Sequence, residues 1–382
     1  MAGAPFLPYG RQDVDDADVL AVAEALRSDW LTTGPRVDEF ERALAAACGA
    51  PHVVVVNSGT AALHAAYEAA GLGPGDEVLT SPLTFAATAN AALHLGAKVR
   101  FVDVDARSGL IDPGQVSAAL TPSTKLVVPI DYTGQPADYP ALMRLAAGTG
   151  TFVIADGAHS LGATLDGAPA GTLAHATTFS FHPVKPVTTG EGGAIATANA
   201  EWDHRMRSFR CHGMERDPLR QRDPGDPWHY EIQALGLNYR LPDVLCALGT
   251  SQLRRLPQFI ARRRAIAARY LTALADVAQL ELPHVRPGVE SGWHLFVVKV
   301  HEAGRRRAFF DALRQAGLGV QVHYEPVHLQ PYYRDLGHRP GECPLAEDFA
   351  ARCVSLPLYP ALSDSEVEHV IDTVRRVAEA VL

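Results

Sequence analysis

Lysine is scarce in this sequence. Of its 34 basic residues only four are lysines, at positions 98, 125, 185 and 299, so each can be considered individually. The five cysteines are widely spaced, and neither a disulfide framework nor a CxxC metal site is predicted from them. Long apolar runs and a basic N-terminal flank are also missing, so we expect no signal peptide and no membrane span. These absences favour a protein of the reducing cytoplasm.

Charge and glycine patterns exclude further classes. The formal net charge is -9 and the isoelectric point is near 6.0, which argues against nucleic-acid binding by a broad basic surface. Neither a GxGxxG dinucleotide fingerprint nor a Walker A motif is present, which makes NAD-dependent chemistry a distant alternative. With 47% hydrophobic and 20% charged residues, the composition is that of a globular enzyme.

The pattern of apolar residues predicts a large α/β domain. Between about residues 53 and 197, short β-branched runs alternate with helical stretches, as in parallel strands joined by crossover helices. The strand-like runs are 53–56, 78–80, 99–102, 126–130, 152–155 and 194–197. Because 382 residues exceed one ordinary core, we expect a second unit. We place a mainly parallel sheet between helices in residues 1–250.

A smaller α+β unit is predicted over residues 251–382. Its expected elements are a strand at 294–300, a helix at 305–316, a short strand at 320–322 and a closing helix at 364–381.

One lysine lies in a stretch with a constrained backbone. Pro183 and Pro186 exclude a regular helix through Lys185, and three glycines at 190, 192 and 193 permit tight turns. A lysine held on such a rigid loop is well placed to react. A turn whose lysine points to solvent is the simpler interpretation, and it would be preferred if the lysine stood alone.

Three further features follow predicted strands, where ligands of open parallel sheets bind. The turn Asn57-Ser58-Gly59-Thr60 opens a helix and offers N–H groups and hydroxyls to a phosphate, although serine is equally common there as a plain helix cap. Asp156 either partners a protonated ring nitrogen or caps the next turn. Phe85 either presents its ring to the site or packs in the core.

Together these features fit one cofactor, pyridoxal 5'-phosphate (PLP). PLP needs a lysine for a Schiff base, an acid at its pyridinium nitrogen, a phosphate cup and a flat face against its ring. Lys185, Asp156 and Phe85 would supply the amine, the acid and the flat face. The cup would be formed by Ser58, Gly59 and Thr60 together with Ser180. No other cofactor explains all four features.

Six stretches, in order along the chain, form a more specific pattern. They are 30–35 (WLTTGP), 57–63 (NSGTAAL), 84–90 (TFAATAN), 156–159 (DGAH), 179–193 and 238–240 (NYR). With these stretches the sequence resembles, almost from end to end, the DegT/DnrJ/StrS sugar aminotransferases, which are fold-type I PLP enzymes. The resemblance implies a seven-stranded type of sheet, pyridoxamine phosphate as an intermediate, and amine transfer from L-glutamate to the ketone of a nucleotide-linked sugar.

The resemblance also implies roles for individual residues. Lys185 would form the Schiff base, Asp156 would meet the ring nitrogen, and His159 and Phe85 would face the two sides of the ring. The phosphate would be held by Thr60, Ala61 and Ser180. Asn238 would reach the cofactor of a neighbouring subunit, which implies a homodimer with shared active sites. The residues expected to contact the substrate are Tyr9, Leu31, Thr32, His182, Arg240, His323, Tyr324 and His328.

Within the family, stretches 8–12, 181–186 and 322–333 are most similar to the pseudaminic acid pathway enzymes, which aminate C4 of a UDP-linked 4-keto-6-deoxy sugar. This similarity favours a UDP- or dTDP-linked ketosugar, aminated at C4. Two departures from common members are Asp131-Tyr132-Thr133-Gly134, where many carry a histidine, and Gly157 in place of a larger residue. The first bears on sugar preference more than on catalysis.

Alternative functions stay open. The same fold supports PLP-dependent sugar dehydratases, although Lys185 argues against one because related 3-dehydratases carry histidine there. A cofactor-binding regulatory protein without turnover is another alternative. Metal binding by His323 and His328 is not favoured, because Pro326 and Pro331 indicate an irregular loop with no further ligands grouped nearby. The role of Glu191 is open between ligand contact and ordering of the glycine loop.

Overall fold

The computed structural model describes residues 6–382 and contains a central seven-stranded sheet. Its strands, in spatial order, are β2 (His52–Val56), β10 (Gly193–Thr197), β9 (Ala176–Ser180), β6 (Phe152–Asp156), β5 (Thr124–Val128), β3 (Glu77–Thr80) and β4 (Lys98–Phe101). β10 runs antiparallel to both neighbours, whereas the other pairs are parallel. The predicted fold class, an α/β protein with a mainly parallel sheet, is confirmed.

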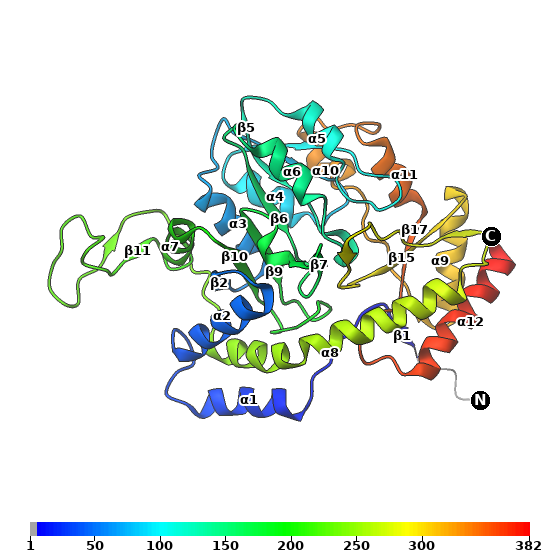
Figure 1. The fold of residues 1–382 in the computed structure, drawn as a ribbon, viewed down its shortest axis with the longest axis horizontal. Coiled ribbons are helices and arrows are strands. Elements are labelled where there is room, and N and C mark those ends of the chain that lie inside the picture. The colour runs from blue at the N-terminus through cyan, green and yellow to red at the C-terminus, as the bar shows by residue number, and fades with distance from the viewer. Residues whose placement is uncertain (1–5) are drawn as a thin grey trace.

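Helices cover both faces of this sheet (Figure 1), because its strands are apolar on both sides. Alternate residues of one strand serve opposite faces: Val54 and Val56 face one helical layer, while Val53 and Val55 face the other. The helices of the first layer are α3 (Gly59–Ala69), α4 (Ala87–His94) and α7 (Ala200–Phe209). Those of the second are α2 (Pro35–Cys48), α5 (Pro113–Ala119), α6 (Tyr139–Ala146) and the first half of α8 (Asp243–Ala273).

Two segments lie outside these layers. α1 (Asp16–Arg27) starts with a capping box formed by Asp15 and Asp18, and it is tied to α8 by Arg255, which lies 2.6 Å from the Asp18 carboxylate. Residues 211–240 form an arm that carries the short antiparallel strands β11 (Met214–Glu215) and β12 (Glu231–Ile232). This arm projects away from the sheet at the left of Figure 1.

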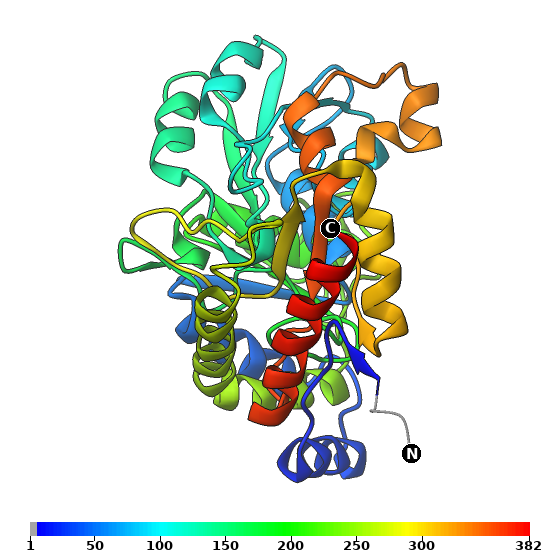
Figure 2. The same cartoon turned by 90° about the vertical axis from the view of Figure 1, so that its right-hand side faces the viewer.

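The C-terminal part builds a second core around a small antiparallel sheet. Its strands are β13 (Leu280–Glu281), β15 (Phe296–Val300) and β17 (Cys353–Leu356), with helices α9 (Arg306–Gln315) and α12 (Asp364–Val381). Figure 2 shows α12 in red and α9 in gold beside these strands. The second half of α8 contributes Ile266, Ala267 and Tyr270 to this core.

Shorter elements complete the chain. They are β1 (Leu7–Pro8), β7 (Thr164–Leu165), β8 (Ala168–Pro169), β14 (Val289–Glu290), β16 (Leu318–Gly319), α10 (Pro331–Asp335), α11 (Pro344–Arg352) and the 3-10 turns Tyr132–Gly134, Ala170–Thr172, Ala303–Arg305 and Val327–Leu329. Among residues 6–382, none of the helices has both the length and the apolar character needed to cross a membrane.

The C-terminal prediction needs correction in detail. The helices at 305–316 and 364–381 correspond to α9 and α12, but α11 and β17 were not predicted. In place of the strand expected at 320–322, the structure has the two-residue strand β16 slightly earlier in the chain. β16 pairs with β1, near the start of the chain, and local sequence cannot reveal such a distant pairing. The proposed boundary at residue 250 falls inside α8, whose two halves pack in different cores. The division into two domains stays a prediction.

Candidate active site

A cavity of about 620 Å³ lies at the carboxyl ends of the central strands, where open parallel sheets bind ligands. Its walls come from the ends of β6 and β9, the turns after β2 and β3, the loop that carries Lys185, and residues 321–324. The predicted residues that line it are Tyr9, Ser58, Gly59, Thr60, Phe85, Asp156, His159, Ser180, His182, Lys185, His323 and Tyr324.

Strand register creates a cup at one end of this cavity. Gly193 of β10 pairs with Val56 of β2 on one side and with Ser180 of β9 on the other, so the ends of β2 and β9 lie close together. A Cβ at Gly193 would be 2.4 Å from the Ser58 carbonyl oxygen, and a Cβ at Gly59 would be 2.9 Å from the Ser180 Cβ. Both contacts are too short, so glycine is required at both positions.

Ser58 caps α3, as its simpler interpretation predicted. Its Oγ accepts a hydrogen bond of 3.0 Å from the Ala61 N–H, so the Ser58 hydroxyl and the Ala61 amide already bind each other. The N–H groups of Gly59 and Thr60, in the first turn, have no partner within the helix. With the positive end of the helix dipole beside Ser180, these amides suit a phosphate.

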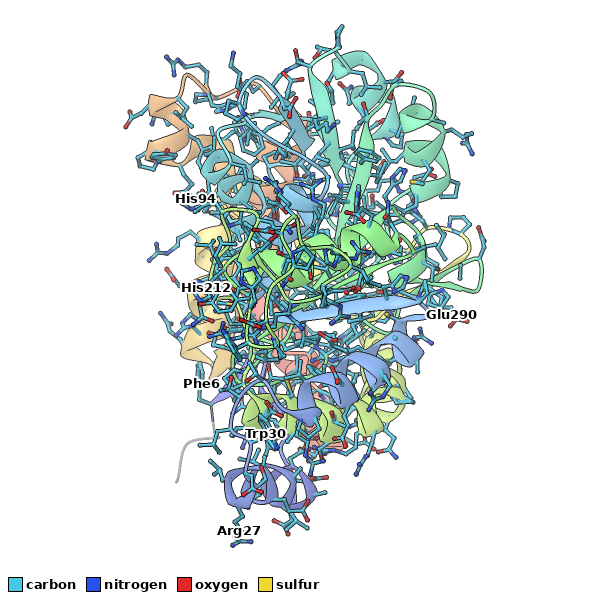
Figure 3. The ribbon with its side chains drawn as sticks, turned by 90° about the vertical axis from the view of Figure 1, so that its left-hand side faces the viewer. Phe6, Arg27, Trp30, His94, His212 and Glu290 are labelled. Atoms are coloured by element: carbon cyan, nitrogen blue, oxygen red, sulfur yellow. The ribbon has the colours of Figure 1, made fainter. Side chains whose placement is uncertain are left out.

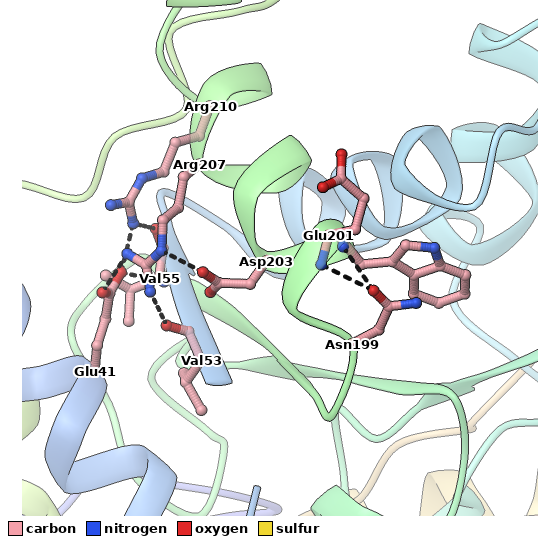
Figure 4. Close-up of polar contacts among 9 residues, drawn as sticks. Glu41, Val53, Val55, Asn199, Glu201, Asp203, Arg207 and Arg210 are labelled. Carbon is pink, nitrogen blue, oxygen red and sulfur yellow. Dashed lines mark hydrogen bonds and ion pairs between the residues drawn. The ribbon is translucent and has the colours of Figure 1, made fainter. Parts of the chain in front are cut away.

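Side chains hold β2 in place just before this turn (Figure 4). β2 is an edge strand, and Glu41 accepts a hydrogen bond of 3.1 Å from the Val55 N–H. Arg207 donates to the Val53 carbonyl at 2.9 Å, and Arg210 donates to the Val55 carbonyl at 2.7 Å. Both guanidinium groups also lie 2.6 Å from the nearly buried Glu41 carboxylate. The strand that leads into the cup is therefore fixed along its open edge.

Asp156 ends β6 and is only 7% exposed. One carboxylate oxygen accepts a hydrogen bond of 2.6 Å from the Thr88 hydroxyl, and the other accepts one of 3.2 Å from the Ala158 N–H. Capping of the following turn therefore occupies one oxygen only. Burial raises the pKa of Asp156, whereas the Thr88 and Ala158 hydrogen bonds and the charge of Lys185 lower it.

Lys185 is half-buried and lines the cavity, so its amine does not simply point to solvent. The backbone N–H of Lys185 donates a hydrogen bond of 2.9 Å to the His182 carbonyl, and this bond closes the turn that contains Pro183. Burial lowers the pKa of Lys185 to about 8, and the nearby Asp156 carboxylate opposes this shift. A lysine with this pKa is partly neutral near physiological pH, as a nucleophile or general base must be.

Two rings define the sides of the cavity. Phe85 is 65% exposed and lines the wall, so the core alternative for it is excluded. His159 is buried, its Nε2 lies 3.2 Å from the Tyr324 hydroxyl, and its Nδ1 has no hydrogen-bond partner among the described residues. Its ring centroid is 4.3 Å from that of His294. Burial lowers the pKa of both histidines well below the usual value, so both rings are neutral.

The N-terminus and the C-terminal part form one wall together. The pairing of β1 with β16 brings the Tyr9 ring to 5.1 Å from the His323 ring. His323 Nδ1 lies 2.8 Å from the Ser355 hydroxyl, which orients the imidazole. Glu191 also lines the cavity, and its backbone carbonyl accepts a hydrogen bond of 2.7 Å from the Thr189 hydroxyl. Both roles considered for Glu191 are therefore compatible with its position.

Several predicted residues do not reach the cavity within one chain. Leu31, Thr32 and Asn238 are exposed elsewhere. Asn238 lies on the arm, where its carbonyl is 3.5 Å from the Asn57 side-chain amide. Arg240 lines a separate cavity of about 620 Å³ together with Trp30 and Cys211.

His328 is placed differently from its predicted substrate contact. It is fully buried beside Phe101, and its Nε2 lies 2.9 Å from the Glu347 carboxylate. Contacts with Phe101 of β4 and with Glu347 of α11 thus hold this imidazole away from the cavity that contains His323. Within residues 6–382, no group of three or more histidine, cysteine, aspartate or glutamate side chains is arranged to hold a metal ion.

Three cavity or neighbouring residues had no role assigned from sequence. Thr84 and His294 line the cavity, and Thr88 binds Asp156. The positions of Thr84 and Thr88 on either side of Phe85 were the only signal for them, since both lie in one of the stretches that resemble the family. His294 lies two residues before β15, and local sequence gives no sign that it meets His159.

Comparison with known proteins identifies the relationship. The sequence model of the DegT/DnrJ/EryC1/StrS aminotransferase family matches residues 12–375. The chain belongs to this family. The spore coat polysaccharide biosynthesis protein SpsC of Bacillus subtilis is 41% identical over 379 residues, which cover 98% of this chain and 97% of SpsC.

Solved structures of aminotransferases share the fold. A Streptococcus pneumoniae protein assigned as a sugar aminotransferase, in its PLP form, is 32% identical with a TM-score of 0.92, over 99% of this chain and 100% of that one. Helicobacter pylori PseC, an aminotransferase involved in the biosynthesis of pseudoaminic acid, is 31% identical with a TM-score of 0.93, over 98% of this chain and 100% of that one.

PLP is the cofactor of this DegT/DnrJ/EryC1/StrS protein, and the pneumococcal structure is known in both PLP and pyridoxamine phosphate forms. The cavity offers the groups that PLP needs: it is lined by the Lys185 amine, the Asp156 carboxylate, Gly59 of the cup and His159, whose Nδ1 has no hydrogen-bond partner among residues 6–382. When bound, PLP supplies an electron sink for a developing carbanion. The chain is a PLP-dependent sugar aminotransferase.

Proposed function

We propose that this aminotransferase moves an amine from L-glutamate to the C4 ketone of a UDP- or dTDP-linked 4-keto-6-deoxy sugar. The observation that carries the proposal is the meeting of Lys185 and Asp156 in one cavity beside a phosphate cup. The names of two relatives, SpsC in spore coat polysaccharide biosynthesis and PseC in pseudoaminic acid biosynthesis, support a sugar acceptor. A narrower proposal is that the acceptor is the UDP-linked sugar of the pseudaminic acid route.

Several cavity residues have a defined task in this proposal. Lys185 would hold the cofactor at rest, and its Nζ would then move a proton from Cα of glutamate to the cofactor and, in the second half-reaction, from the cofactor to the sugar carbon that receives the amine. Its pKa of about 8 suits both directions of transfer. When PLP is bound, Asp156 would keep a proton on the ring nitrogen, and Phe85 and His159 would contact the ring. The N–H groups at Gly59 and Thr60, with Ser180, would anchor the phosphate.

The proposal includes a homodimer with shared sites. On the arm, Trp228 is 78% and Leu235 is 92% exposed, and such a group of apolar side chains favours an interface. His212 lies at the start of the arm, and Figure 3 shows it on the side of the molecule where Trp30 also lies. Asn238 on this arm is available to a partner's cofactor. Leu31, Thr32 and Arg240 would contact substrate only in such an assembly.

The proposed reaction is tested with L-glutamate and a panel of 4-keto and 3-keto nucleotide sugars, with products identified by mass spectrometry and NMR. We expect 2-oxoglutarate and a C4 amino sugar. The Lys185→Ala variant should lose at least about 1,000-fold in rate, whereas Lys125→Ala, a change outside the cavity, should not. A Lys185→Ala variant with wild-type turnover would exclude the mechanism, and amination of 3-ketosugars alone would exclude the C4 assignment.

The shared site is tested by mixing two inactive variants. In a mixed dimer of Lys185→Ala and Asn238→Ala, one site receives Lys185 from one chain and Asn238 from the other. Activity should therefore return to about one quarter of wild type after random exchange of subunits. If the mixture stays as inactive as its components while mixed dimers form, Asn238 does not act across the interface.

A further inference from the structure

Thr88 makes the shortest hydrogen bond to Asp156. The Thr88 hydroxyl lies 2.6 Å from one Asp156 carboxylate oxygen, and both side chains are buried. An ionised carboxylate only accepts, so the Thr88 hydroxyl is the donor. This distance falls in the range of charge-assisted O–H···O⁻ hydrogen bonds, which are stronger than neutral ones. The second oxygen has only the longer bond from the Ala158 N–H, at 3.2 Å.

A second threonine orients this donor. The Thr84 hydroxyl is 2.8 Å from the Thr88 hydroxyl. Because the Thr88 proton points to Asp156, Thr88 accepts here and Thr84 donates. Thr84 itself lines the cavity. Two hydroxyls therefore donate in one direction, from the cavity wall toward Asp156, and each hydrogen bond polarises the next.

The surrounding structure leaves Thr88 little alternative. Threonine near a helix start commonly bonds a backbone carbonyl one turn back, and the Phe85 carbonyl is 3.3 Å from the Thr88 hydroxyl. The carboxylate is much closer, so it takes the proton. The Thr88 backbone is held from the other side by the Tyr67 hydroxyl, which donates to the Thr88 carbonyl at 3.1 Å. Helix α4 is thereby fixed against α3, and the Thr88 hydroxyl faces β6.

From these contacts we infer that Thr88 is a positioning residue of the transamination reaction: it keeps the Asp156 carboxylate ionised and oriented, and Thr84 sets the direction of its hydroxyl. The inference rests on the role proposed for Asp156 and is independent of the acceptor sugar. A buried acid that took up its own proton could no longer hold one on a ring nitrogen. Removing the Thr88 hydroxyl therefore weakens Asp156 as the partner of the cofactor, although no group that would touch the cofactor is removed.

The test replaces Thr88 by Val, which has the same shape but no hydroxyl. Thr80→Val is the matched control, because the buried Thr80 hydroxyl donates to the Val128 carbonyl at 2.8 Å and not to Asp156. Holoenzyme turnover with L-glutamate is measured against pH. We expect kcat to fall about tenfold or more in Thr88→Val, and the acidic limb of its pH profile to move up by about one pH unit.

The other titratable groups around Asp156 are unchanged by this substitution. They are Lys185, Asp131, Tyr67, Tyr139 and Tyr324. A displaced acidic limb therefore reports on Asp156. Thr88→Ser, which restores a hydroxyl, should bring both kcat and the acidic limb of the pH profile back toward wild type. If the Val variant were impaired only by altered packing or lower stability, the smaller Ser side chain would not restore these two values.

A second readout needs no turnover. The visible spectrum of each holoenzyme is titrated with acid in the absence of any amine donor, and Thr88→Val should change form at a higher pH than Thr80→Val. Coincident titrations of the two variants would overturn the inference. Absence of turnover in the wild type would instead contradict the proposed reaction. If Thr88→Val does not fold, Thr84→Val should shift the titration in the same direction by a smaller amount, and no shift would again overturn the inference.

Discussion

The hydroxyl of Ser160 donates a hydrogen bond of 2.5 Å to the buried carboxylate of Asp131. The same carboxylate accepts from the Tyr139 hydroxyl at 2.7 Å and from the Ala137 N–H at 3.0 Å. Ser160 directly follows His159, so Asp131 fixes the turn after β6 against the segment after β5. A residue that does not line the cavity thus determines where His159 lies.

Replacing Asp131 by Ala should destabilise the protein by about 2–4 kcal/mol, because it removes the acceptor that the Tyr139 hydroxyl and the Ala137 N–H share and leaves a cavity in the core. Chemical denaturation at pH 5, below the Asp131 pKa that burial raises to about 7, measures the loss without the contribution of a buried charge. Asp311→Ala, at an exposed helical ion pair with Arg307, is the control and should change little. An Asp131→Ala protein as stable as the control would show that this network adds nothing to folding.

In the cofactor-free protein, Lys185 should react with an amine-directed reagent at lower pH than an ordinary lysine. Its pKa is lowered to about 8 by burial, so the neutral amine is scarce below pH 8 and becomes dominant above it. An ordinary lysine reaches that point only near about 10.4. Labelling rates followed by peptide mass spectrometry from pH 6 to 10 should show half-maximal modification of residue 185 near pH 8. A midpoint above pH 10 would contradict this.

Gly59→Ala should weaken PLP binding by about tenfold or more. The new methyl group would meet the Ser180 Cβ at 2.9 Å, which forces the cup open, at a cost of about 1–3 kcal/mol. Fluorescence titration of the cofactor-free protein with PLP measures this affinity. Gly73→Ala is the matched control, because no heavy atom lies within 4 Å of the position that its new methyl group would take. Equal affinities of the two variants would exclude a tight cup at Gly59.

Glu41→Gln should destabilise the protein by about 3 kcal/mol, since it leaves the two guanidinium groups of Arg207 and Arg210 without their shared, nearly buried carboxylate. Hydrogen exchange at the Val55 amide should also accelerate, because that N–H donates to Glu41. Glu39→Gln at the exposed Arg36 pair is the control, with an expected change below about 0.5 kcal/mol. Unchanged exchange at Val55 would contradict the proposed fixing of β2.

The meeting of Asp156 and Phe85 could be predicted because both follow predicted strands of one sheet, and the carboxyl ends of parallel strands share an edge. The phosphate turn could be predicted for the same reason, although the capping bond from Ala61 to Ser58 shows that backbone amides, more than the serine hydroxyl, are available there. Lys185 is indicated by its constrained loop instead, because β9, the strand that precedes it, is not among the predicted strands.

Contacts between distant segments could not be predicted. The Thr88 bond to Asp156 spans 68 residues and depends on how α4 packs beside β6. His328 shares a proline-rich stretch with His323, but the paths of α10 and α11 bury it against Glu347 while His323 enters the cavity. The pairing of β1 with β16, which supplies Tyr9, joins opposite ends of the chain and has no local signal.

The side chains along β2 have a consequence for aggregation. An open edge strand is a template onto which another chain can add by backbone pairing. Here the Val53 and Val55 carbonyls are already occupied by arginine side chains, and the Val55 N–H is occupied by Glu41. Strand addition at this edge would have to displace a partly buried ion cluster, which protects copies of this protein from joining their sheets into a continuous ribbon there.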